Sequence, residues 1–168
     1  MKTVVINGES PRFYNAIEGL LSSDRFGCVM ELIGKRVGEE YLVRCANSFN
    51  RIPEETLEKL YNASAEYLTD LVADHAGEFD LDEYCVINAE NVRYMLRPEQ
   101  LIAEAHDLLA DEDAPVAYSV TLVFRPVPDE RIEWTVRDGE PVYVGEFRGI
   151  SPWNEKVRKK SWNYVREC

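Results

Sequence analysis

The clearest pattern of hydrophobic and polar positions lies in the last third of the chain, where three strand-like runs follow one another. Residues 118–124 are rich in β-branched and aromatic side chains, and residues 131–137 alternate strictly between apolar and polar. Asp138-Gly139 then supplies the residue types that a type I′ turn needs, and residues 141–147 return as a further apolar run. The pattern predicts a three-stranded antiparallel meander.

The alternation of the second run predicts which of its side chains are buried. A half-buried antiparallel strand directs alternate side chains to the core and the others to water. We expect the core-facing set to be Ile132, Trp134 and Val136, and the water-facing set to be Arg131, Glu133, Thr135 and Arg137.

Shorter runs before residue 50 predict strands and one helix. Residues 2–6 form a short apolar run that is typical of a strand. Residues 11–22 begin with a proline after a serine and place apolar side chains at helical spacing, which favours a short helix. Residues 25–33 and 39–46 have the composition of strands, and the glycine-containing segment 34–38 between them predicts a hairpin.

The middle of the chain carries the strongest helical signal. Residues 53–76 begin with a proline and two glutamates and keep an apolar stripe at helical spacing, which predicts a long helix. Residues 80–95 are ambiguous between helix and strand, and 88–96 fit a second short helix ended by a proline. Residues 98–110 favour a helix, although a strand over 100–105 remains open.

These elements predict an α+β fold, in which an antiparallel sheet packs against one long helix and shorter helices. The chain has 168 residues, 45% of them hydrophobic, which suffices for one core. We expect residues 1–150 to form a single α+β domain. Residues 151–168 form a basic tail that contains Trp153 and Trp162, as a short helix or an extended arm.

The charge of the chain is strongly negative and unevenly distributed. The net charge is −12; residues 51–115 hold 17 acidic against 4 basic side chains, and residues 148–168 hold 6 basic against 2 acidic. Such a body repels phosphates, which argues against nucleic-acid binding, and it favours a basic protein partner. A charge that serves only solubility is the plainer alternative.

The candidate contact residues for a protein partner combine acidic loops with the aromatic tail. Tryptophan is frequent in binding hot spots, so the tail is a candidate for partner contact, unless both indoles pack back onto the acidic body. The candidates are Asp80, Asp82, Glu83, Asp111, Glu112, Asp113, Trp153 and Trp162.

The residue types that catalysis or metal binding needs do not occur in suitable patterns. The four cysteines are far apart in sequence, so no zinc or redox motif is present, and we expect Cys28 and Cys45 to be small buried side chains. His75 and His106 have no nucleophile beside them in the sequence, and the glycines form no phosphate loop. We predict no catalytic residue, cofactor, metal or membrane span, and a cytoplasmic location.

A set of strand, helix and turn signals spans residues 26–147. The signals are Phe26-Gly27 at the start of a strand, the helix near 57–71, Leu122-Val123-Phe124 before a loop, Val136-Arg137-Asp138-Gly139, and Tyr143-Val144-Gly145. This combination resembles small bacterial domains of unknown function that occur among the immunity-like proteins of polymorphic toxin systems. The resemblance implies an α+β domain, neutralisation of a toxin, and a strand at 100–105. It implies no catalytic residue.

The sequence therefore leaves three functions open. The first is an acidic interaction domain, and in its narrower form an immunity-type inhibitor, that neutralises a basic protein partner. The second is a small-molecule-binding or enzymatic domain with a pocket between helix and sheet, lined by Tyr61, Tyr94 and Trp134. The third is a structural protein that assembles through its tail. The sequence does not specify the oligomeric state.

Overall fold

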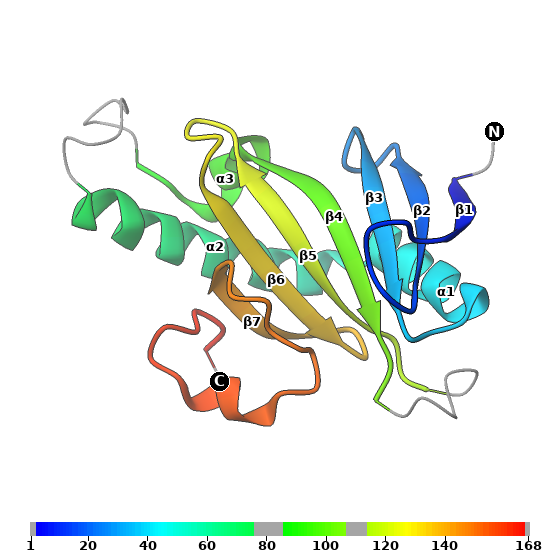
Figure 1. Cartoon of the computed structure of the whole chain (residues 1–168). Coiled ribbons are helices and arrows are strands. Elements are labelled where there is room, and N and C mark those ends of the chain that lie inside the picture. The colour runs from blue at the N-terminus through cyan, green and yellow to red at the C-terminus, as the bar shows by residue number, and fades with distance from the viewer. Residues whose placement is uncertain (1–2, 76–85, 107–113, 167–168) are drawn as a thin grey trace.

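The computed structural model describes residues 3–75, 86–106 and 114–166, and these form an α+β fold. Seven strands build one sheet with three α-helices on one of its faces (Figure 1). The strands are β1 (Val4–Glu9), β2 (Ala16–Ser23), β3 (Cys28–Lys35), β4 (Leu96–Glu104), β5 (Ala117–Phe124), β6 (Arg131–Arg137) and β7 (Glu140–Glu146). The helices are α1 (Glu39–Asn50), α2 (Glu54–Asp74) and α3 (Ala89–Met95), and η1 (Glu155–Lys159) is a 3₁₀ turn. The predicted α+β class is confirmed, whereas the sheet is mixed rather than wholly antiparallel, because β3 and β4 pair in parallel.

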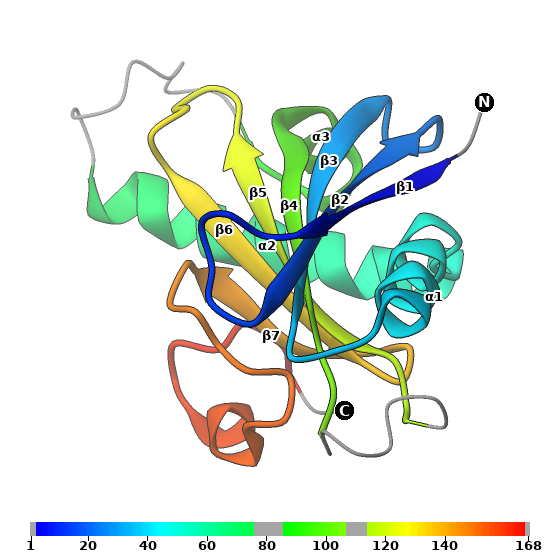
Figure 2. The ribbon, with the colours of Figure 1, turned by 45° about the vertical axis from the view of Figure 1, so that its right-hand side comes forward.

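The strands lie in the sheet in the order in which they occur in the chain. All neighbours are antiparallel except β3 and β4, which run parallel. A parallel pair needs a crossover connection, and here α1, α2 and α3 form it. Both views show the helices behind the sheet, while the β1–β2 loop and the C-terminal tail lie in front of it (Figures 1 and 2).

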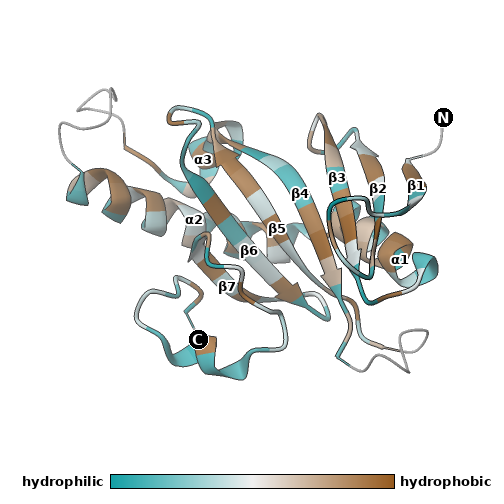
Figure 3. Ribbon diagram, viewed as in Figure 1, coloured by the Kyte–Doolittle hydropathy of each residue, from teal (hydrophilic) through white to brown (hydrophobic). Residues whose placement is uncertain are grey.

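The core between α2 and the sheet is closed around the indole of Trp134. The indole N–H donates a 2.8 Å hydrogen bond to Ser64 Oγ, whose hydroxyl donates to the Leu60 carbonyl at 2.7 Å. The ring of Tyr61 meets the indole edge-on, with 5.3 Å between centroids. A buried indole needs such an acceptor, so this contact fixes the position of α2 over the sheet. Along α2, hydrophobic and hydrophilic stretches alternate in the way an amphipathic helix requires (Figure 3).

Three sequence predictions are confirmed in outline. The long helix predicted over 53–76 is α2, and glutamates occupy its first turn. The short helix predicted over 88–96 is α3, which begins at a capping box between Asn88 and Asn91. The strands predicted in the last third are β5, β6 and β7, which pair antiparallel in sequence order.

Three other predictions are wrong, each because tertiary pairing overrode a local pattern. Residues 11–22 form no helix; β2 begins at residue 16 and pairs along its length with β3. Residues 39–46 belong to α1 rather than to a strand, and the buried side chains of that helix recur every three to four positions. The described part of the predicted helix, residues 98–106, contains no helix; β4 ends at Glu104 and lies between β3 and β5, and residues 107–110 are outside the described residues. The strand alternative over 100–105 is the one observed, up to residue 104.

Candidate interaction surfaces

The exposed face of α2 is the most acidic surface that one described element presents. Its 21 residues carry six acidic side chains and one lysine, and all seven are exposed. Glu55, Glu58, Asn62 and Glu66 follow one another at spacings of three and four, so they form a continuous ridge. We call these four residues the α2 ridge.

A groove runs along each side of the α2 ridge. One, of about 510 Å³, lies between α2, β7 and the tail, and Ala63, Pro141 and Val165 are its apolar lining residues. The other, of about 650 Å³, lies between α2 and residues 87–89. Asn62 and Glu66 line both grooves, so a molecule bound across the ridge contacts them from either side.

Many arginine side chains of the described residues pair with carboxylates of the same chain. Arg93 and Arg25 both reach Glu54, at 2.7 and 3.2 Å, and hydrogen bonding to Arg93 is the main reason why the pKa of Glu54 is lowered. Other pairs are Arg131–Glu99, Arg137–Glu155, Arg148–Glu146, Arg158–Glu155 and Arg166–Glu66. Glu55 and Glu58 form no ion pair with the residues that the structure describes. The α2 ridge therefore keeps carboxylates available to a partner.

The tail lies against the open face of the sheet and along β7. Trp153 donates its indole N–H to the Glu104 carbonyl at 2.8 Å and packs against the ring of His106. Trp162 meets Tyr143 edge-on, and the Arg148 guanidinium lies 4.3 Å from its ring centroid. Both tryptophans are half-buried by contacts within the chain. Both indoles therefore pack onto the body of the domain, as the second of the two sequence interpretations expected.

Asn163 joins the tail to the edge of β7. Its side-chain oxygen accepts from the backbone N–H groups of Val144 and Val165, at 3.3 and 3.0 Å. Its amide group donates to the carbonyls of Val142 and Val157, at 2.9 and 3.0 Å. The side chain is 2% exposed, so it supplies buried strand groups with partners that a further strand would otherwise provide.

Glu133 is a buried carboxylate beneath the segment that joins β7 to the tail. It is 1% exposed and accepts hydrogen bonds from the backbone N–H groups of Ile150 (2.8 Å) and Gly149 (3.2 Å). Burial raises the pKa of Glu133 to about 7, against the opposing effects of these N–H groups and of Lys35. The prediction that Glu133 and Thr135 face water is therefore wrong, because the segment that follows β7 covers their face of β6. The alternation of apolar and polar residues does not reveal that another segment of the chain lies over this face.

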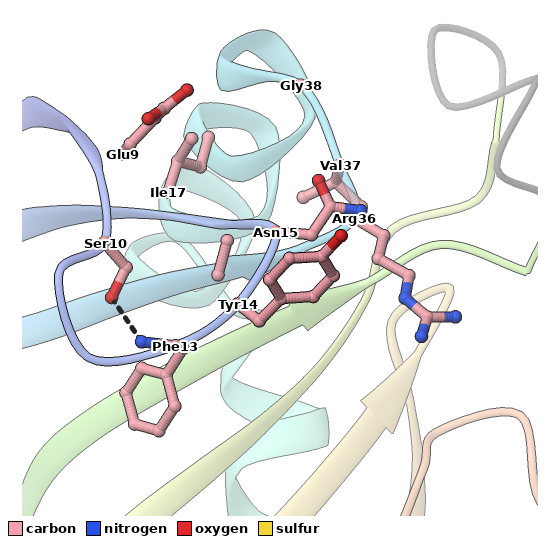
Figure 4. A pocket seen from close by; sticks show the side chains of 10 residues that line it. Glu9, Ser10, Phe13, Tyr14, Asn15, Ile17, Arg36, Val37 and Gly38 are labelled. Atoms are coloured by element: carbon pink, nitrogen blue, oxygen red, sulfur yellow. Dashed lines mark hydrogen bonds between the residues drawn. The ribbon is translucent and has the colours of Figure 1, made fainter.

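A third hollow lies where the parallel strands β3 and β4 end (Figure 4). The β1–β2 loop and the segment after β3 enclose about 720 Å³, lined by Glu9, Ser10, Phe13, Tyr14, Asn15, Ala16, Ile17, Arg36, Val37 and Gly38. Ser10 Oγ accepts from the Phe13 backbone N–H at 3.0 Å and so shapes the loop. Tyr14 is 98% exposed. The lining residues include acidic, basic and exposed aromatic side chains. Among them no nucleophilic side chain lies beside a general base.

The remaining predicted site residues divide into those that the structure places and those that it does not. Asp80, Asp82, Glu83, Asp111, Glu112 and Asp113 lie outside the described residues. Trp134 and Tyr61 contact each other and fill the space expected to hold a pocket, whereas Tyr94 is 79% exposed. Among the described residues, no three His, Cys, Asp or Glu side chains are placed to hold a metal ion. No helix in the described parts of the chain is long and apolar enough to cross a membrane.

Comparison with known proteins gives this chain no relative. No protein-family model, curated protein or solved structure matches it significantly. The function must therefore be argued from the surfaces above.

Proposed function

We propose that this chain is a protein-interaction domain of immunity type that binds and blocks a basic protein partner. The observation that carries the proposal is the exposed face of α2, with six carboxylates against one lysine and a groove along each side. Basic side chains of a partner can pair with the ridge carboxylates, and its apolar side chains can enter the grooves on either side. A cytoplasmic location belongs to the same proposal.

The electrostatics of the whole chain support this choice of partner. A net charge of −12 produces a long-range field that attracts a cationic protein and raises its rate of encounter. The ridge then provides the specific contacts, since Glu55 and Glu58 are exposed and pair with no described cation. The resemblance to immunity-like domains points the same way.

The test is capture of a partner by the full-length chain and by two variants that lose the same charge. Glu55→Gln/Glu58→Gln removes two carboxylates from the ridge. Glu39→Gln/Glu40→Gln removes two from the first turn of α1 and serves as the matched control. We expect the ridge variant to bind the captured protein roughly fivefold more weakly, because two exposed charge pairs contribute about 1 kcal/mol together.

Salt provides the second readout of the same experiment. Binding is expected at about 0.05 M salt and to be mostly lost at about 0.5 M, where surface charges are screened. Equal weakening by both charge variants, or an affinity that does not change with salt, contradicts the acidic-surface proposal.

A further inference from the structure

The end of the chain already occupies the acidic face of α2. The Tyr164 hydroxyl donates a 2.8 Å hydrogen bond to Asp70, and its ring meets Tyr67 edge-on at 5.3 Å. Arg166 lies 3.7 Å from Glu66, a residue of the α2 ridge, and its guanidinium lies over the ring of Tyr164. An aromatic residue and a cation two positions later thus contact the acidic helix together.

The backbone of the same segment contacts β7. Tyr164 N–H donates to the Val144 carbonyl at 2.9 Å, as a residue of an added edge strand does. The segment after Asn163 therefore binds the body in three ways: a backbone bond to β7, a hydroxyl bond to Asp70 and an ion pair with Glu66. This is the chemistry by which one protein recognises an extended segment of another.

These contacts are weak enough to exchange. Arg166 and Glu66 are both more than half exposed, and exposed ion pairs contribute little because water and salt screen them. Asn163, in contrast, is buried and makes four hydrogen bonds. Beyond Asn163 the exposed contacts are those of the Tyr164 hydroxyl and the Arg166 guanidinium, while Val165 donates its N–H to Asn163 and packs, like the ring of Tyr164, against the core.

We propose that Tyr164 and Arg166 are an internal ligand of the α2 face, and that the partner displaces them with an extended segment of the same chemistry. That segment carries a tyrosine and, two residues later, an arginine, and it donates a backbone N–H to Val144. The proposal rests on the proposed function and adds to it the chemical identity of the partner's contact segment. Tyr164 and Arg166 then restrict binding to partners whose segment binds α2 more tightly than they do.

The test uses the full chain and a labelled synthetic peptide with the sequence of residues 161–166, Ser-Trp-Asn-Tyr-Val-Arg. Tyr164→Phe/Arg166→Gln in the protein weakens the internal ligand without touching the α2 face. We expect this variant to bind the peptide about tenfold more tightly than the wild type, the ratio that corresponds to one lost hydrogen bond to a charged group. Adding Glu66→Gln/Asp70→Asn to that variant is expected to reverse the gain.

A control peptide in which phenylalanine and glutamine replace the tyrosine and arginine is expected to bind weakly to every protein. Equal peptide affinity for the wild type and the Tyr164→Phe/Arg166→Gln variant overturns the proposal, and so does a gain that survives loss of Glu66 and Asp70. Thermal melts show whether each variant is folded. Failure of the peptide test leaves the result of the Glu55/Glu58 capture experiment unaffected, so the two proposals fail separately.

Discussion

The two halves of the outer sheet face differ in what covers them. Over β5, β6 and β7 the chain after β7 buries polar groups and gives them partners: Glu133 accepts from the N–H groups of Gly149 and Ile150, and Ser119 donates to the Ile150 carbonyl at 3.0 Å. Over β1, β2 and β3 the cross-strand neighbours Val5 and Leu20 are 44% and 43% exposed, and Val29 on the next strand is 62% exposed. In Figure 1 the tail lies next to β7, and the β1–β2 loop passes in front of β2 and β3.

On this face of the sheet, the buried side chains include polar ones and the exposed side chains include apolar ones. The covered half buries polar groups because the segment over it supplies their hydrogen-bond partners, and Val157 and Trp162 of the tail also form an apolar cluster with Val142 and Tyr143. The half that the tail leaves uncovered exposes the apolar side chains of Val5, Leu20 and Val29, and there Arg12 of the β1–β2 loop pairs with Glu18 and Glu31. Stability should therefore be concentrated in polar residues of the covered half.

The largest effect is expected from Asn163→Ala. The substitution leaves the N–H of Val144 and the carbonyls of Val142 and Val157 without partners, so we expect a loss of about 4 kcal/mol in unfolding free energy. Denaturant unfolding measures it. A loss below about 1 kcal/mol would show that the tail contributes little to the covered half.

A smaller effect is expected from the ionisation of Glu133. Its folded pKa of about 7 exceeds its ordinary value of 4.5, so folding favours the protonated form. The stabilisation is complete below about pH 4.5 and is lost as the pH rises through 7, by about 3 kcal/mol in all. The charged or titratable groups that face this carboxyl are Lys35, Tyr143 and, through its backbone N–H, Arg148.

The measurement is the unfolding free energy of the wild type and of Glu133→Gln between pH 4.5 and pH 8. Other groups titrate in both proteins, so the difference between their unfolding free energies reports the ionisation of Glu133 alone. We expect the wild type to lose its advantage over the variant as the pH rises. A difference that stays constant with pH would mean that Glu133 has an ordinary pKa.

The smallest effect is expected on the uncovered half. Val29→Thr keeps a β-branched side chain at an exposed strand position, so the unfolding free energy should change by less than about 0.5 kcal/mol. Val123→Thr on β5, where the same residue type is 4% exposed, is the matched control and should cost more. Equal costs at both positions would remove the distinction between the two halves.

The sequence predicted the fold where local pattern and tertiary environment agree. The α2 stripe and the turn at Asp138-Gly139 belong to this class, and Asp138 has the positive φ that the turn requires. Residues 11–22 and 39–46 were mispredicted because short apolar runs fit either period, and pairing partners far away in sequence decide between them.

The candidate surfaces were predictable only in part. The acidic excess of α2 is visible in the sequence, but its grooves depend on the tail and on residues 87–89, which no pattern places beside it. Glu133 read as a water-facing residue because alternation specifies a face and not what lies over it. The contact of Tyr164 with Asp70 joins positions 94 residues apart, beyond the reach of any spacing rule.

The single parallel pairing in the sheet has a consequence for how the chain reaches its native state. The hairpins β1–β3 and the meander β5–β7 each close over short loops, whereas β3 and β4 meet only after the crossover of residues 36–95 is in place. Contacts so distant in sequence incur a large loop-closure entropy before they contribute stability. We therefore expect the two ends of the sheet to organise early and the β3–β4 seam to set the folding rate, so that a substitution at this seam slows folding more than it speeds unfolding.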